Sequence, residues 1–121
     1  MLGGGSIRPH YNLNAWKEAM SLVKAVHEFT ETLLPSEKYG LVAQMRRAGV
    51  SIPSNIAEGA ARTSAKEFAQ FLSIAKGSLS ELETQSLITR DLGYATAVDE
   101  LLAKASKVSR LLSGLRKSIS K

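Results

Sequence analysis

Side chains that commonly bind transition metals are scarce in this sequence. Its 121 residues include two histidines and no cysteine. Metal-binding helical bundles use Glu-x-x-His elements, which place a carboxylate and an imidazole on one helical face. Neither His10 nor His27 has a glutamate three positions before it. We therefore expect no metal and no other cofactor, and we interpret His27 as a core or interface histidine.

No segment has the residue pattern that nucleophilic or phosphoryl-transfer catalysis needs. The sequence has no G-x-S-x-G elbow, no phosphate-binding loop motif and no dinucleotide-binding glycine pattern. Glu81 and Glu83 are two positions apart, and on a helix such carboxylates point in different directions. The sequence therefore predicts a protein that is not an enzyme.

The segment from residue 46 to residue 59 combines helical hydrophobic spacing with residues that disfavour helices. It has the sequence RRAGVSIPSNIAEG. The ring of Pro53 would press against the carbonyl of Gly49, four residues earlier, and a glycine there lets the backbone bend. The pair therefore predicts a kink within a helix that ends near Gly59. Its polar side chains would form one ridge, either solvated or facing another subunit: Arg47, Ser51, Ser54 and Glu58, with Asn55 at the edge.

Hydrophobic periodicity predicts four helices and no strands. The helices are expected at about residues 14–34, 36–59, 64–93 and 96–121. Ser64-Ala-Lys-Glu67 is a capping box, while Asn14 and Asp99 give weaker signals for helix starts. Short connections between long helices predict an all-α fold, an antiparallel up-and-down four-helix bundle.

The predicted core lies along one apolar stripe of each helix. The first helix is expected to bury Trp16, Met20, Val23, His27 and Thr30, with Leu22, Val26, Phe29 and Leu33 beside them. The other stripes are Leu41, Met45, Ala48, Ile52 and Ile56; then Phe68, Leu72, Ala75, Leu79, Leu82, Ser86 and Thr89; then Val98, Leu101, Ala105, Val108, Leu112, Leu115 and Ile119.

A single domain is predicted over residues 14–121, after a flexible, glycine-containing tail of residues 1–13. The sequence has no leader pattern and no run of roughly 18 apolar residues that would cross a membrane. We therefore expect a cytoplasmic protein that does not contact a membrane.

The third helix has more apolar surface than one core stripe needs. Ile74, Ile88 and Leu92 form a second strip, and the small residues Gly77 and Ser78 interrupt it. A broad stripe can be accommodated within one bundle, but helices that are apolar on two sides in so small a chain favour self-association. The strip is therefore the predicted oligomer interface.

Positive charge is concentrated near the C-terminal end of the sequence. The formal net charge is +5, and residues 94–121 contain six basic and two acidic residues. Four of these basic residues lie opposite the apolar stripe of the last helix: Lys107, Arg110, Lys117 and Lys121. The strip is either an ordinary solvated face or a surface for phosphate backbones. No aromatic residue lies among these charges, so base stacking is not indicated.

Three segments resemble a known bacterial family, namely LNAWKEAMSLV, YGLVAQMRRAGVSIPSNIAEGAAR and EFAQFLSIAKGSLSELETQSLI. The family comprises four-helix-bundle proteins encoded in intervening sequences of large-subunit ribosomal RNA genes. It is related to the accessory variability protein of diversity-generating retroelements. The resemblance covers roughly residues 11–94, and its most specific element is the Arg-Arg-Ala-x-x-Ser-Ile-Pro-x-Asn-Ile-Ala-Glu-Gly pattern at residues 46–59.

The resemblance implies a homopentamer without known catalytic activity. The retroelement relative is thought to engage RNA through a basic surface, so by analogy the leading hypothesis is binding of structured RNA. The residues it implicates are Lys107, Arg110, Lys117 and Lys121, together with Arg46, Arg47 and Arg62. Asn55 and Glu58 would instead organise the kinked segment or the subunit contacts. The alternative is a scaffold that binds a protein partner and has no direct role in nucleic-acid binding.

Overall fold

The described part of the protein is entirely helical. A computed structural model describes residues 8–33, 35–95 and 97–120. Within these ranges there is no strand, and the α-helices are α1 (Asn14–Thr30), α2 (Ala43–Ala60), α3 (Ala65–Asp91) and α4 (Asp99–Ile119). A short 3-10 helix, η2 (Pro9–Asn12), precedes them, and η3 (Pro35–Glu37) and η4 (Lys38–Val42) lie between α1 and α2. The prediction of an all-α fold with four helices is confirmed.

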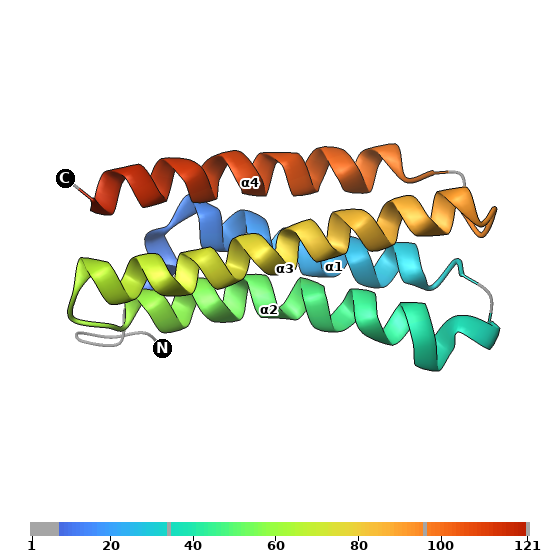
Figure 1. The fold of residues 1–121 in the computed structure, drawn as a ribbon, viewed down its shortest axis with the longest axis horizontal. Coiled ribbons are helices and arrows are strands. Elements are labelled where there is room, and N and C mark those ends of the chain that lie inside the picture. Colours follow the sequence, from blue (N-terminus) through green and yellow to red (C-terminus); the bar gives the residue numbers. More distant parts are fainter. Residues whose placement is uncertain (1–7, 34, 96, 121) are drawn as a thin grey trace.

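The four helices pack so that α2 and α4 occupy opposite corners. α2 packs against α1 and α3, and α4 packs against the same two helices. Figure 1 shows α4 along one edge of the bundle and α2 along the other, with each helix running back along the preceding one. The outward faces of α2 and α4 therefore point away from each other and form two separate surfaces.

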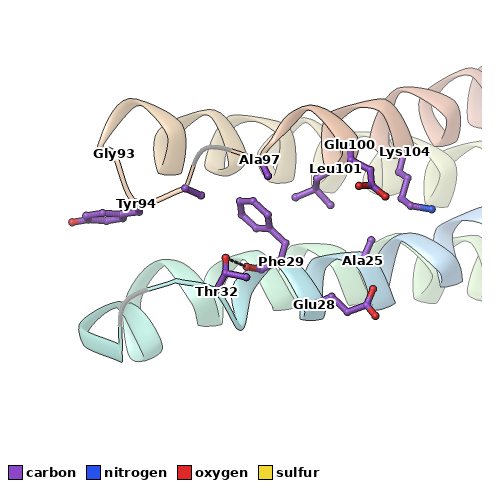
Figure 2. Close-up of a pocket in the computed structure, with 11 residues that line it drawn as sticks. Ala25, Glu28, Phe29, Thr32, Gly93, Tyr94, Ala97, Glu100, Leu101 and Lys104 are labelled. Atoms are coloured by element: carbon purple, nitrogen blue, oxygen red, sulfur yellow. Dashed lines mark hydrogen bonds between the residues drawn. The ribbon is translucent and has the colours of Figure 1, made fainter.

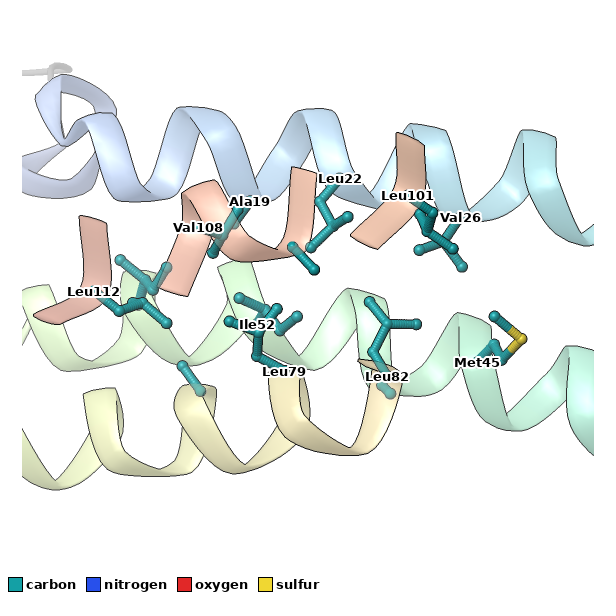
Figure 3. Close-up of a cluster of buried hydrophobic side chains, with 14 of the residues drawn as sticks. Ala19, Leu22, Val26, Met45, Ile52, Leu79, Leu82, Leu101, Val108 and Leu112 are labelled. Atoms are coloured by element: carbon teal, nitrogen blue, oxygen red, sulfur yellow. The ribbon is translucent and has the colours of Figure 1, made fainter. Parts of the chain in front are cut away.

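All four helices contribute side chains to one core, as Figure 3 shows for Leu22, Ile52, Leu79 and Val108. The predicted stripes of α2, α3 and α4 are confirmed at nearly every position, although Leu41, Phe68, Leu115 and Ile119 are only partly buried. The largest fully buried hydrophobic side chains are Leu22, Met45, Ile52, Ile56, Leu79, Leu82, Leu112, Val26, Val98 and Val108.

The predicted stripe of α1 is partly wrong. Met20 is 47% exposed, and His27 is exposed with its Nδ1 atom 3.3 Å from the Val23 carbonyl oxygen. The buried stripe consists of Ala15, Ala19, Leu22, Val26 and Thr30. Small alanines occupy the first two turns because they let the neighbouring helices approach, so the larger residues beside them lie on the flank. Side-chain size, rather than hydrophobicity alone, determines which face of α1 is buried.

Helix starts follow the predicted caps only in α3. The Ser64 Oγ atom accepts a hydrogen bond of 3.1 Å from the Glu67 backbone N–H, as expected for a capping box. Asn14 is not an N-cap, because it is already the first residue of α1 and follows Leu13. The predicted box at Asp99 is also wrong, since α4 begins there after Val98 with no side-chain cap. Thr96, the expected start, lies outside the described residues.

Two element boundaries also differ from the prediction. The helix expected from residue 36 begins with a 3-10 turn and a π-helical turn, so regular α2 starts only at Ala43.

The expected tail of residues 1–13 includes η2, which packs against α1 and α2. The His10 ring lies 4.9 Å from the Trp16 ring, and burial together with the Arg8 charge lowers the pKa of His10. Aromatic packing therefore extends the domain to at least Pro9, while residues 1–7 and Lys121 lie outside the described residues.

Pro53 lies inside α2, whose helical hydrogen-bonding pattern continues to Ala60. The missing N–H of Pro53 removes the donor that would otherwise serve the Gly49 carbonyl. A Cβ atom on Gly49 would lie 3.6 Å from a Val26 methyl group, which is ordinary contact. The observed setting of Gly49 is thus a buried contact with α1, and the kink at Gly49 and Pro53 stays a prediction.

Gly59 is the position where a side chain cannot be accommodated. A Cβ atom there would lie 2.7 Å from the Phe71 Cβ atom, 2.9 Å from Phe68 Cδ1 and 3.3 Å from the Phe68 carbonyl oxygen. Real Cβ atoms do not approach other atoms so closely, and one of these neighbours is backbone. Gly59 therefore sets how near the end of α2 lies to the start of α3.

We predict that Gly59→Ala lowers the free energy of unfolding by about 1–3 kcal/mol, because α2 and α3 must separate to admit the methyl group. Gly114→Ala is the matched control, since a Cβ atom there meets nothing within 4 Å and Gly114 is exposed within α4. The control should gain about 0.5–1 kcal/mol from helix propensity. Urea denaturation measures both; equal effects of the two substitutions would contradict the steric account.

Candidate functional site

Large hydrophobic residues are exposed on three of the four helices. Among the described residues, Met20 on α1, Val50 on α2, Ile74 and Ile88 on α3, and Leu92 just after α3 are between 40% and 57% exposed. None of these residues belongs to α4. The predicted strip of Ile74, Ile88 and Leu92 thus lies at the surface, and Val50 and Met20 extend it. We call these five residues the apolar side.

The predicted polar ridge of α2 divides into two parts. Ser51 lies against α3, where its Oγ atom is 2.8 Å from the Ser78 Oγ atom. Asn55 donates from Nδ2 to the Ser51 carbonyl at 2.8 Å and to the Ser51 Oγ at 2.9 Å. Arg47, Ser54 and Glu58 are instead exposed. Ser51 therefore links α2 to α3, and Asn55 binds the Ser51 hydroxyl from within α2. Ser78 is the partner that linear spacing did not reveal.

Arg46 binds the C-terminal end of α1. Its Nε atom donates to the Thr30 Oγ1 atom at 2.8 Å, and one of its terminal nitrogens donates to the His27 carbonyl at 3.5 Å. The same nitrogen lies 3.3 Å from a carboxylate oxygen of Glu31. The Thr30 hydroxyl and the His27 carbonyl also have hydrogen-bond partners at the end of α1, so the guanidinium adds a charged donor to them and interacts favourably with the negative end of the helix dipole. Arg46 is therefore largely committed to the fold.

Arg62 is also engaged by neighbouring side chains. It lies 3.5 Å from the Glu58 carboxylate and 4.9 Å from the centre of the Phe71 ring. Both contacts are at the surface, where the ion pair contributes less than about 1 kcal/mol and leaves the guanidinium free to exchange partners. Arg62 could thus reach an external anion, whereas Arg46 would have to leave α1 to do so.

The outward face of α4 carries the predicted cationic strip. Lys107 is 56% exposed and lies 3.4 Å from Glu18 of α1, and Arg110 donates to the Ser106 Oγ atom at 3.0 Å. Lys117 is exposed one to two turns further along, and Lys121 lies outside the described residues. We call Lys107, Arg110 and Lys117 the cationic strip; its ion pair with Glu18 is exposed and weak.

Further basic residues lie beside the strip, in the groove between α3 and α4. Lys76 of α3 donates from Nζ to the Ser113 Oγ atom of α4 at 3.0 Å. Lys66 of α3 and Arg116 of α4 line one pocket of about 520 Å³. Linear periodicity did not reveal these residues, because their proximity depends on how α3 pairs with α4. Hydroxyl groups accompany them throughout the groove.

Charge is also divided between the two ends of the bundle. The half that contains the end of α4 (residues 8–22, 54–77 and 105–120) has nine basic and three acidic residues. The opposite half (residues 23–53 and 78–104) has six basic and eight acidic residues. We call these the basic half and the acidic half. The excess positive charge therefore lies in the same half as the pocket of Lys66 and Arg116, at the end of the bundle where Figure 1 marks the C-terminus.

The structure does not bring all the predicted nucleic-acid-binding residues together. The cationic strip lies on α4, whereas Arg47 lies on α2 at the opposite corner and in the acidic half. Arg62 lies in the basic half, near the start of α3. The geometry thus groups the cationic strip with Lys66, Lys76 and Arg116, and it leaves Arg46 and Arg47 apart from them.

A second pocket, of about 530 Å³, opens between α1 and the start of α4. Figure 2 shows the Phe29 ring directed into it, facing Ala97 and Leu101. Glu28, Glu100 and Lys104 lie at its polar edge, so its charges are mixed. The Glu37 carboxylate raises the pKa of nearby Tyr94. This pocket combines an apolar floor with no consistent charge, and it favours no single ligand class.

Two further properties concern the part of the chain that the structure describes. No group of three or more histidine, aspartate or glutamate side chains there is arranged to hold a metal ion. No helix there has the length and apolar character needed to cross a membrane.

A comparison with protein families identifies the family of this chain. The model of the family described as 23S rRNA-intervening sequence protein matches residues 11–114. The chain belongs to this family. The predicted resemblance is thereby confirmed, whereas the relation to the retroelement protein stays a prediction. No curated protein matches the chain.

The family match covers the apolar side completely and the cationic strip only in part. It includes α1, α2, α3 and most of α4, with Lys107 and Arg110, and it ends before Arg116 and Lys117. The apolar side and the Ser51–Asn55–Ser78 contact therefore lie entirely within the family region. The most basic end of α4 lies beyond it.

We predict that Arg46→Met lowers the free energy of unfolding by about 1 kcal/mol, because Thr30 and the end of α1 lose their charged donor. Arg47→Met is the matched control, since Arg47 is the next residue and is exposed. It should change stability by less than about 0.5 kcal/mol. Thermal and urea unfolding of the two variants provide the comparison; a larger loss for Arg47→Met would contradict the assignment.

Proposed function

We propose that this protein is a non-enzymatic, homo-oligomeric helical bundle that binds structured RNA through the cationic side of α4. The observation that carries the proposal is the separation of two surfaces. Among the described residues, the exposed large hydrophobic ones lie on α1, α2 and α3 or directly after α3, whereas the cationic strip lies on α4, at the corner opposite α2. One surface can therefore bury itself against other copies while the other stays accessible.

Self-association is supported by the composition of the apolar side. Large hydrophobic residues that together occupy one side of a small domain are typical of interaction surfaces. The family resemblance favours a homopentamer, in which closed symmetry would use the same contact five times. Each subunit would then present its own cationic strip, so the assembly would carry a repeated positive field.

RNA is the favoured ligand because of the charge pattern and the family. The family description links its members to 23S rRNA intervening sequences. The strip has lysine, arginine and serine side chains without aromatic residues, a composition suited to phosphate and ribose contacts rather than to base stacking. We expect shape-dependent binding that weakens as salt concentration rises. A cytoplasmic location would be consistent with the lack of cysteine.

A protein-binding scaffold is the second candidate, and the apolar side is the observation that favours it. That surface would serve a protein partner as well as another copy of the chain. Affinity capture from a nuclease-treated lysate separates the two functions. A scaffold would retain a stoichiometric protein partner after the RNA is destroyed, whereas an RNA-binding assembly would lose what it captured.

Replacing Lys107, Arg110, Lys117 and Lys121 together with glutamine should lower affinity for a structured RNA at least tenfold. The slope of log affinity against log salt concentration should become shallower by about one for each phosphate that the variant no longer neutralises. A four-charge control away from α4 replaces Lys17, Lys24, Arg47 and Arg90 with glutamine. Fluorescence anisotropy with a ribosomal RNA fragment measures both; equal reductions in the two variants would mean that only net charge matters.

Replacing Ile74 or Ile88 with glutamate should dissociate the assembly, because the interface would bury an unpaired charge. Light scattering should then report a mass near the 13.0 kDa of one chain. Ala103→Glu is the matched control, since Ala103 is exposed on α4. A variant at Ile74 or Ile88 that keeps the wild-type mass would exclude that residue from the interface.

A further inference from the structure

A pocket between the start of α3 and the end of α4 has a consistent chemical character. Its volume is about 520 Å³, within the range of about 300–1,000 Å³ that is usual for small-ligand sites. Two cations, two hydroxyls and an amide line it, together with alanine and isoleucine side chains. The lining residues are Lys66, Arg116, Ser73, Ser120 and Gln70, with Ala65, Ala69 and Ile119.

The charges of this pocket all favour an anion. Lys66 and Arg116 come from different helices and face the same space, and no acidic side chain is among the described residues that line it. The pocket lies within the basic half of the bundle, whose excess charge adds to the positive potential. Arginine matches phosphate oxygens with two parallel N–H groups, and lysine adds a point charge. A phosphate group is the ligand that this combination fits best.

The rest of the pocket fits what is attached to a phosphate in RNA. Ser73 and Ser120 can donate to and accept from ribose hydroxyls, and the Gln70 amide offers both a donor and acceptors to a base edge. Ala65, Ala69 and Ile119 add apolar lining that can contact one face of a base. The pocket therefore has the parts needed for one nucleotide.

The pocket also continues the cationic strip. Arg116 directly precedes Lys117, and adjacent residues on a helix point about 100° apart. Lys117 faces outward along the strip while Arg116 faces α3 and the pocket. A strand held by Lys107, Arg110 and Lys117 would thus reach the pocket at the end of α4. We propose that this pocket binds a single unpaired nucleotide at the end of the structured RNA, with its phosphate between Lys66 and Arg116.

This inference rests on the proposed RNA-binding function and specifies its ligand. Bases within a duplex are paired and stacked, so they cannot enter a side pocket, whereas unpaired ends can be splayed out. The strip holds the duplex backbone, and the pocket distinguishes an RNA with an unpaired end from a blunt one. The strip therefore supplies general affinity for RNA, and the pocket supplies selectivity for an unpaired end.

The test uses two RNA hairpins that differ only at the open end, one blunt and one with a two-nucleotide 3′ overhang. Both carry a fluorophore in the loop, and anisotropy is measured at physiological salt with the full-length protein. The wild-type protein should bind the overhang hairpin about tenfold more tightly, the effect expected from one charge-assisted hydrogen bond. The double variant Lys66→Gln/Arg116→Gln should bind both hairpins equally.

Two further variants separate the pocket from net charge. Lys17→Gln/Lys24→Gln removes the same charge from α1 and should keep the tenfold preference. Ala65→Leu adds bulk to the pocket lining without changing charge and should abolish the preference, while circular dichroism confirms that the helices are intact. A preference that survives both Lys66→Gln/Arg116→Gln and Ala65→Leu, or equal binding of the hairpins by the wild type, would overturn the pocket assignment. Failure of the wild type to bind either hairpin would overturn the proposed RNA-binding function itself.

Discussion

The close contact between α2 and α3 is the constraint on which the rest of the structure depends. At one end, Gly59 leaves no room for a side chain between the helix backbone and Phe68 and Phe71. At the middle, Ser51 and Ser78 share a hydrogen bond, and Asn55 holds the Ser51 hydroxyl in place. Because α3 packs against one flank of α2 and α1 packs against the other, α4 occupies the corner opposite α2. The outer face of α2 and the outer face of α4 can then carry different chemistry.

This arrangement gives a physical role to most of the RRAGVSIPSNIAEG segment. Arg46 binds the end of α1, Gly49 faces Val26, Ser51 binds Ser78 of α3, and Gly59 permits the close crossing, while Asn55 binds Ser51 from within α2. The segment therefore contacts both neighbours of α2 along its length. Arg47 and Glu58 are its exposed charges, and they lie on the same side of the molecule as Val50 and Ile74. The described contacts of this segment connect α2 to both of its neighbouring helices, which is a structural role.

Sequence reasoning succeeded where one helix could be treated alone. The stripes of α2, α3 and α4 follow from spacing, and the capping box at Ser64 depends only on residues within four positions. It failed where the outcome depends on how two helices pack against each other. Met20 was placed in the core because hydrophobicity counts do not show that Ala15 and Ala19 face the neighbouring helices. Arg46 was grouped with the free cations because its partners on α1 are distant in sequence, and Lys66 and Arg116 meet only once α3 is paired with α4.

Two proposals are central: α4 binds RNA, and the apolar side mediates self-association. Ultraviolet cross-linking of the purified assembly to a structured ribosomal RNA fragment, followed by mass spectrometry of the cross-linked peptides, tests that division most directly. The account predicts cross-links in α4 and in the first turns of α3, with none in α2. Cross-links concentrated in α2, or an absence of cross-links in α4 at physiological salt, would contradict it.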